Sequence, residues 1–219
     1  MPDIQIIIGF VGFFIQLLAV LIGSLRWKKR TSIQRIVIVM LSISWLIQLI
    51  AREVGQATGN SLWMYHMTML IETGFIWVIY RFQLRSILSQ KFFVSIAIFY
   101  ACFFIYSMLY LQSLSEFPAY IRFVESIIVI FFCITYYVLC LRQLDTQLIH
   151  RSFMFWVSTG LLLYFTSNLL ITLFGNILIQ ESDNESWQAI WSVHNILNVI
   201  LYICFIIAFL QKEGRSSKT

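Results

Sequence analysis

Charged residues inside apolar segments are the part of this 219-residue sequence that could do chemistry. Glu72, Arg122 and Glu125 each stand within a run of mostly apolar residues. A charged group at the centre of a lipid bilayer costs several kcal/mol, so such residues usually face the interior of a helix bundle and mark a functional site. Glu72 is the most informative of the three, because it is the deepest acid and no basic residue is close to it in the sequence.

Further polar side chains recur at helical spacing in other apolar segments. In the last segment, Trp191, His194, Asn195 and Asn198 stand at positions i, i+3, i+4 and i+7, so they share one face of a helix. Comparable polar faces occur in four other segments. The candidate ligand-binding residues are Arg52, Tyr65, His66, Glu72, Arg122, Glu125, Asn168, Trp191, His194, Asn195 and Asn198.

These candidates lie at similar depths, on the side of the membrane opposite most of the basic residues. With about 1.5 Å of rise per helical residue, Glu125 and His194 are about 9 Å from that surface and Glu72 is about 15 Å from it. Polar residues at one depth on several helices predict an outward-facing pocket between the second, third, fifth, sixth and seventh helices.

Each of these features also has a purely structural interpretation. Arg122 and Glu125 are three residues apart and could simply neutralise one another. Arg52 could anchor a helix end at the membrane surface. The asparagines could form hydrogen bonds that hold helices together. The sequence alone leaves these alternatives open.

Seven apolar runs account for most of the chain. Hydrophobic residues make up 60% of it and charged residues 11%, whereas an ordinary soluble domain has about 25% charged residues. Each run has the roughly 20 residues that a bilayer-spanning helix needs. The sequence therefore predicts an all-α polytopic membrane protein with a single transmembrane domain, residues 1–219, that forms a seven-helix bundle. The predicted spans are approximately residues 4–25, 36–55, 62–80, 92–112, 119–141, 152–175 and 188–210.

Basic residues are distributed unevenly between the connecting segments. All of the 15 Lys and Arg residues except Arg52 and Arg122 fall at connections on one side of the predicted bundle or in the C-terminal tail. Loops rich in Lys and Arg stay on the cytoplasmic side of a membrane. We therefore expect the N-terminus outside and the C-terminus in the cytoplasm. This placement accounts for the net charge of +5 without a nucleic-acid partner.

The motifs of several known chemistries do not occur in the sequence. The seventh segment has no lysine that could form a retinal Schiff base, and the HExxH zinc motif and glycine-rich nucleotide loops are absent from the sequence. We predict no cofactor and no catalytic residue, and an enzymatic activity is not favoured. His66 and His194 are weak candidates for binding a metal ion.

Two stretches near the C-terminus resemble a group of bacterial proteins. Residues 153–168 begin with FMFWVS and end with YFTSN, and residues 191–198 are WSVHNILN. Together with Glu125, these stretches resemble small uncharacterised seven-helix proteins of Bacteroidetes-type bacteria that tend to be encoded near sensor histidine kinases. The resemblance implies a bacterial inner membrane protein and favours signalling, with a histidine kinase as a partner. It transfers no catalytic residue.

These observations favour a membrane-embedded sensor or receptor-like module. A small ligand would enter the pocket from outside and change the packing of the helices, and a protein partner would detect the change. One alternative is a small transporter in which Glu72 is the coupling site. Another is a membrane enzyme acting on lipid-linked substrates, with Glu72 or Glu125 as acid or base. A structural subunit of a larger complex is a further alternative.

Overall fold

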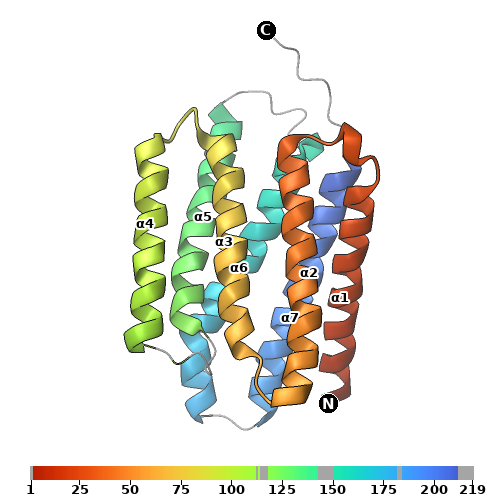
Figure 1. Cartoon of the computed structure of the whole chain (residues 1–219), viewed down its shortest axis with the longest axis vertical. Coiled ribbons are helices and arrows are strands. Elements are labelled where there is room, and N and C mark those ends of the chain that lie inside the picture. Colours follow the sequence, from red (N-terminus) through yellow and green to blue (C-terminus); the bar gives the residue numbers. More distant parts are fainter. Residues whose placement is uncertain (1, 112, 114–117, 143–149, 182–183, 212–219) are drawn as a thin grey trace.

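A computed structural model describes residues 2–111, 113, 118–142, 150–181 and 184–211, and within these ranges it describes the side chains of residues 7–172 and 192–211. In this part of the chain the backbone forms seven long α-helices and no strand (Figure 1). The helices are α1 Pro2–Ser24, α2 Ser32–Thr58, α3 Leu62–Leu84, α4 Gln90–Tyr106, α5 Ala119–Arg142, α6 Phe153–Glu181 and α7 Asn184–Leu210.

All seven helices are long and apolar enough to span a membrane, as judged over the described residues. The prediction of an all-helical chain with seven helices long and apolar enough to span a membrane is therefore confirmed over the described residues. The structure also explains where individual helices begin and end, which the apolar runs alone do not.

The ends of α2 are set by local hydrogen bonds and by a glycine. The Gln34 backbone N–H donates to Thr31 Oγ1 at 3.4 Å, and the Thr31 N–H donates to Gln34 Oε1 at 3.1 Å. This reciprocal pair is a capping box, which starts the helix at Ser32 rather than near residue 36. At the other end, Gly59 has a φ of 76°, a left-handed conformation that glycine adopts readily.

Four other helices also differ by several residues from the predicted spans. α3 ends at Leu84 rather than near residue 80. α6 continues to Glu181 and α7 begins at Asn184, beyond the predicted limits at residues 175 and 188. An apolar run marks the part of a helix inside the bilayer, and backbone hydrogen bonding can continue past it. α4 stops at Tyr106, and residues Ser107–Leu111 form a π-helical turn, although the apolar run extends to residue 112.

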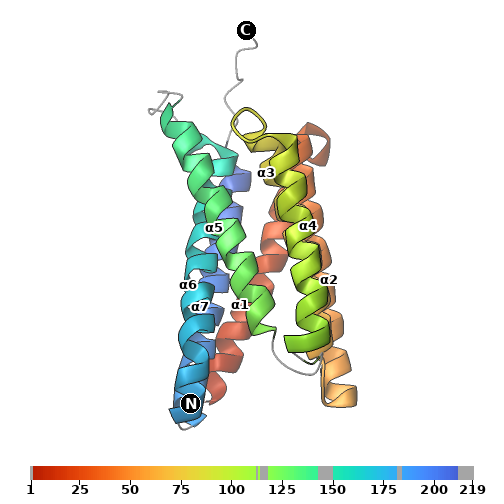
Figure 2. The same ribbon diagram turned by 90° about the vertical axis from the view of Figure 1, so that its left-hand side faces the viewer.

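The helices form two layers (Figures 1 and 2). One layer contains α5, α6 and α7, and the other contains α2, α3 and α4. α1 packs against both α2 and α7 and so joins the layers along one side, while α3 contacts α5 on the other side. α4 contacts α3 and α5 and lies at the outer edge of its layer.

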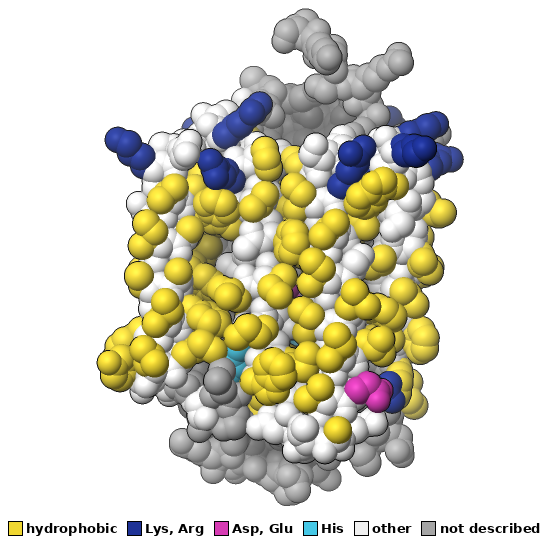
Figure 3. All heavy atoms as spheres, in the orientation of Figure 1, with side chains coloured by type: hydrophobic (Ala, Val, Ile, Leu, Met, Phe, Trp, Pro, Cys, Tyr) yellow, Lys and Arg dark blue, Asp and Glu magenta, His cyan; other side chains and the backbone are white. Residues whose placement is uncertain are grey.

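The outer surface of the bundle is apolar over most of its height (Figure 3). Phe14, Leu21, Ile98, Phe99 and Leu109 are all more than half exposed. Large exposed apolar surfaces are unusual on soluble monomers and are satisfied by lipid tails. Lys and Arg side chains gather at the upper end in Figure 3, where α1, α3 and α5 end and α2 and α4 begin. We call this the basic end of the bundle.

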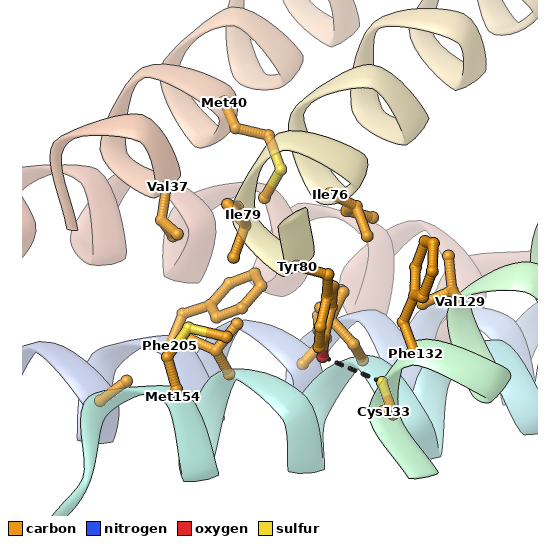
Figure 4. Packing of buried hydrophobic residues seen from close by; sticks show 14 of the residues in the cluster. Val37, Met40, Ile76, Ile79, Tyr80, Val129, Phe132, Cys133, Met154 and Phe205 are labelled. Atoms are coloured by element: carbon orange, nitrogen blue, oxygen red, sulfur yellow. Dashed lines mark hydrogen bonds between the residues drawn. The ribbon is translucent and has the colours of Figure 1, made fainter. Parts of the chain in front are cut away.

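The half of the bundle nearest the basic end is filled by a core of apolar side chains (Figure 4). Tyr80 of α3 stacks on Phe132 of α5 with ring centroids 5.6 Å apart. The Tyr80 hydroxyl is paired with Ser158 Oγ at 2.8 Å and with Cys133 Sγ at 3.1 Å. Phe205 of α7 is almost completely buried in the same cluster. Side chains from both layers therefore close this half of the interior.

Candidate functional site

A cavity of about 520 Å³ lies between the two layers, in the half of the bundle away from the basic end. Its walls come from the first half of α1 and α3, the second half of α2, the middle part of α7, Ser61 just before α3, one residue of α5 and one of α6. The lining residues are Ile8, Gly9, Phe10, Gly12, Phe13, Ile47, Gln48, Ala51, Arg52, Ser61, Met64, Tyr65, Thr68, Glu72, Arg122, Tyr164, His194, Asn195, Asn198 and Tyr202.

Glu72 is the acidic side chain on the cavity wall. Tyr65, Thr68 and Glu72 are three, four and seven residues apart on α3, so the helix turns all three towards the same space. Ser44 of α2 donates a hydrogen bond from Oγ to Glu72 Oε1 at 2.7 Å. Among the residues that the structure describes, Glu72 takes part in no ion pair. The carboxylate is therefore oriented by a neutral group and lacks a bonded counter-charge.

Arg122 and Glu125 form a buried ion pair at the junction of α5 and α3. Arg122 Nη1 donates to Glu125 Oε2 at 2.9 Å, and Thr73 Oγ1 donates to Glu125 Oε1 at 2.6 Å. Glu125 has no exposed surface, and it lies behind the cavity wall rather than on it. Arg122 does line the cavity, and its guanidinium also lies over the Phe165 ring, 5.9 Å from the centroid.

His194 of α7 is held by α6. Its Nδ1 is 2.9 Å from Asn168 Oδ1, and its ring centroid is 5.7 Å from that of Tyr164. His194, Asn195 and Asn198 line the cavity, whereas Asn168 is buried behind His194. Asn168 therefore sets the orientation of the imidazole rather than facing the cavity itself.

The cavity reaches the surface beside Arg52. This arginine is exposed and also lines the cavity, and its guanidinium lies 4.6 Å from the centroid of the Phe10 ring of α1. Tyr65 is 40% exposed and lines the same opening from α3. We call this region, formed by Phe10, Arg52 and Tyr65, the mouth of the cavity.

Seven of the predicted site residues share the cavity, three do not line it, and the side chain of one is not described. Arg52, Tyr65, Glu72, Arg122, His194, Asn195 and Asn198 are on its walls. Glu125 and Asn168 do not line the cavity. Glu125 is bonded to Arg122 and Asn168 to His194, and these two partners do line it. His66 is 1% exposed, its Nδ1 is 3.2 Å from the Leu62 carbonyl oxygen of its own helix, and it does not line the cavity. The Trp191 side chain lies outside the described residues.

α1 forms a wall of the cavity, although the predicted pocket did not include the first helix. α1 lies against α7 at Gly9 and Gly12: a Cβ built on Gly9 lies 3.7 Å from Asn195 Nδ2, and one on Gly12 lies 3.7 Å from Val199 Cγ2, which are ordinary packing distances. The same turns of α1 bring Phe10 and Phe13 to the cavity. Gly9 and Gly12 lie three residues apart on α1, a spacing of small residues that is typical of helices in close contact. This pattern in the sequence could have predicted the wall that α1 forms.

The residues present can bind a small molecule by charge, hydrogen bonds and apolar contact. Within the described part of the chain, no group of three or more His, Cys, Asp or Glu side chains is placed to hold a metal ion. A metal at His66 and His194 stays a weak hypothesis. Comparison with known proteins finds no family model, no curated protein and no solved structure that matches the chain.

Proposed function

We propose that this protein is a membrane receptor-like module, which binds a small molecule in the cavity between its two layers and signals through a partner protein. The observation that carries the proposal is the position of Glu72, an acid without an ion pair in the described structure, on the wall of a cavity that reaches the surface. A buried charge without a partner is costly in a membrane, and a ligand can supply the missing partner.

The proposed orientation places the mouth of the cavity outside the cell. Most of the Lys and Arg side chains visible in Figure 3 lie at the basic end. Such residues are retained on the cytoplasmic side of a membrane. Together with the sequence resemblance described above, this supports a bacterial inner membrane protein that takes its ligand from the periplasmic side. A histidine kinase would be a suitable partner at the cytoplasmic side.

The helices α1 and α7 are suited to carry a signal between the two ends. Both line the cavity, and at the basic end Arg30 holds them together. Arg30 donates to the carbonyl oxygens of Gly23 and Ile22 in α1, at 3.1 and 3.2 Å, and to that of Phe209 in α7 at 2.9 Å. A shift of α7 against α1 at the cavity would therefore change the hydrogen bonds that Arg30 makes with the two helices.

Transport is less well supported than binding. A transported molecule would have to pass the apolar core in the basic half, where Tyr80, Phe132 and Phe205 are almost completely buried. An enzyme with Glu125 as acid or base is also less well supported, because Glu125 lies behind Arg122 and off the cavity wall.

Native mass spectrometry of the gently solubilised full chain tests the proposal. We expect the wild-type protein to retain one small molecule. His194→Ala should lose it, because the variant removes an imidazole that lines the cavity. Glu53→Gln is the matched control, since Glu53 is exposed near the end of α2 and does not line the cavity.

Two results would count against the proposal. A wild-type protein that is empty in every preparation contradicts it. So does a retained molecule that is kept equally by wild type and His194→Ala. If the retained molecule crosses vesicle membranes that contain the protein, transport is the better account.

A further inference from the structure

We infer that the cavity selects a small organic amine with one positive charge, whose ammonium group binds Glu72 and whose apolar body points towards the mouth. This inference rests on the proposed function and names the class of ligand. It follows from the balance of charges, from the composition of the walls and from the position of Arg52.

Counted by formal charges among the described residues, the inner end of the cavity has one negative charge in excess. Arg122 is already paired with Glu125 at 2.9 Å, so these two charges cancel. Glu72 is left, with a hydrogen bond from Ser44 but no ion pair among the described residues. An ammonium group bound at Glu72 makes this region neutral, whereas an anion there adds a second uncompensated negative charge. In a low-dielectric interior this difference favours the cation strongly.

Aromatic rings and hydrogen-bonding groups surround the same position. Tyr164 and Tyr202 line the same cavity as Glu72. Aromatic faces next to a carboxylate are a common arrangement for binding an organic ammonium ion. Nearer the surface than Glu72, the wall combines apolar side chains such as Ile8, Phe10 and Met64 with polar ones such as Thr68 and Asn195. The hydrocarbon body of an amine can contact the apolar side chains of this part of the wall.

Arg52 limits the ligand to one positive charge. Ser44, which is bonded to Glu72, and Arg52 are eight residues apart on α2, so they are separated by about 12 Å along the helix axis. A second ammonium group at the outer end of the ligand would therefore approach the Arg52 guanidinium at the mouth. Like charges in contact are unfavourable, so a diamine of this length should bind more weakly than a monoamine.

Three probes with the same ring test the inference on the full chain in a neutral maltoside detergent. They are cyclohexylmethylamine, cyclohexylmethanol and cyclohexanecarboxylate, which carry a positive, zero and negative charge. We expect the amine to raise the thermal unfolding midpoint in a concentration-dependent way, with an affinity at least about tenfold higher than that of either other probe. This comparison needs only wild-type protein.

Variants then assign the selectivity to particular residues. Glu72→Gln should weaken amine binding at least about tenfold, and Glu72→Asp should restore part of it. Glu53→Gln should bind the amine as wild type does. A diamine that spans the separation between Ser44 and Arg52 when extended, 1,8-diaminooctane, should bind wild type more weakly than octylamine does, and Arg52→Gln should remove that difference.

The possible failures separate the two proposals. If the alcohol or the carboxylate binds better than the amine, the inference about amines is overturned, while the proposed binding function stands. Amine binding that Glu72→Gln leaves unchanged also overturns it. If none of the probes binds, the amine inference is overturned, and the retained molecule sought by native mass spectrometry decides the proposed function separately.

Discussion

At the scale of single residues, Glu72 and Glu125 have different roles although both lie within apolar helices. Glu125 accepts hydrogen bonds from Arg122 and Thr73 and has no exposed surface. Glu72 has one hydrogen bond, from Ser44, and faces the cavity. The first acid is therefore part of the support of the site, and the second is available to a ligand.

The Arg122–Glu125 pair predicts strong coupling between two substitutions. Glu125→Gln or Arg122→Gln alone leaves a buried charge without its partner and should destabilise the fold by about 3 kcal/mol. The double variant removes both charges, so it should be more stable than the sum of the two single effects predicts. Unfolding midpoints of the four proteins measure this coupling. Additive effects would show that the two side chains do not stabilise one another.

At the scale of helices, close approaches between backbones hold the wall of the cavity in place. α6 and α7 meet at Gly160, where an added Cβ would lie 2.8 Å from Cys204 Cβ and 3.1 Å from Leu201 Cδ1. Gly74 of α3 faces outwards and has no atom within 4 Å of such a Cβ. The same chemical change therefore has opposite consequences at the two positions.

We expect Gly160→Ala to destabilise the protein by about 2 kcal/mol, because it forces α6 and α7 apart. Gly74→Ala should be neutral or stabilise the helix by up to about 1 kcal/mol, since alanine favours helix more than glycine does. Thermal unfolding of the purified variants checks both. Equal effects at the two positions would mean that α6 and α7 are not in close contact at Gly160.

Arg30 gives a second prediction about helices. It caps the carbonyl ends of α1 and α7 at the basic end, and its guanidinium also lies 5.4 Å from the centroid of the Phe209 ring. Carbonyl groups at helix ends lack partners within the helix. Arg30→Ala should therefore lower the free energy of unfolding by about 2 kcal/mol.

Arg85→Ala is the control for this prediction, because Arg85 is exposed at the same end of the bundle. Its unfolding midpoint should match that of wild type. If Arg30→Ala is as stable as Arg85→Ala, Arg30 does not tie α1 to α7, and the proposed path of the signal loses its support.

Comparison of sequence and structure shows which contacts a linear pattern can predict. The spans follow from apolar runs, and the Arg122–Glu125 pair follows from a spacing of three residues on one helix. The contacts Ser44–Glu72 and His194–Asn168 join different helices. Their formation depends on how far one helix slides along another, and periodicity within a helix does not determine that.

At the scale of the whole molecule, the uneven charge distribution predicts the orientation in the membrane. Gln56 is exposed at the end with the cavity mouth, and Ser86 is exposed at the basic end. In intact cells, Gln56→Cys should react with a membrane-impermeant maleimide, and Ser86→Cys should react only after permeabilisation. The reverse pattern of labelling would show that the cavity opens to the cytoplasm.

The central claim concerns the interior: one half holds an open cavity and the other a packed core. Thr68 of α3 lines the cavity, whereas Ser158 of α6 is fully buried in the basic half and bonded to Tyr80. Cysteine substitutions at these two positions compare the halves directly. The exposed Cys102 is replaced by serine in both variants to remove a background reaction.

The most direct measurement is the rate at which the small cation methanethiosulfonate ethylammonium modifies these two cysteines in the solubilised full chain. We predict that Thr68→Cys reacts at least about tenfold faster than Ser158→Cys, and that cyclohexylmethylamine slows the reaction at Thr68→Cys alone. Equal rates at the two positions, or no reaction at Thr68→Cys, would contradict the account. The polar residues between the layers would then hold the helices together rather than form a binding site.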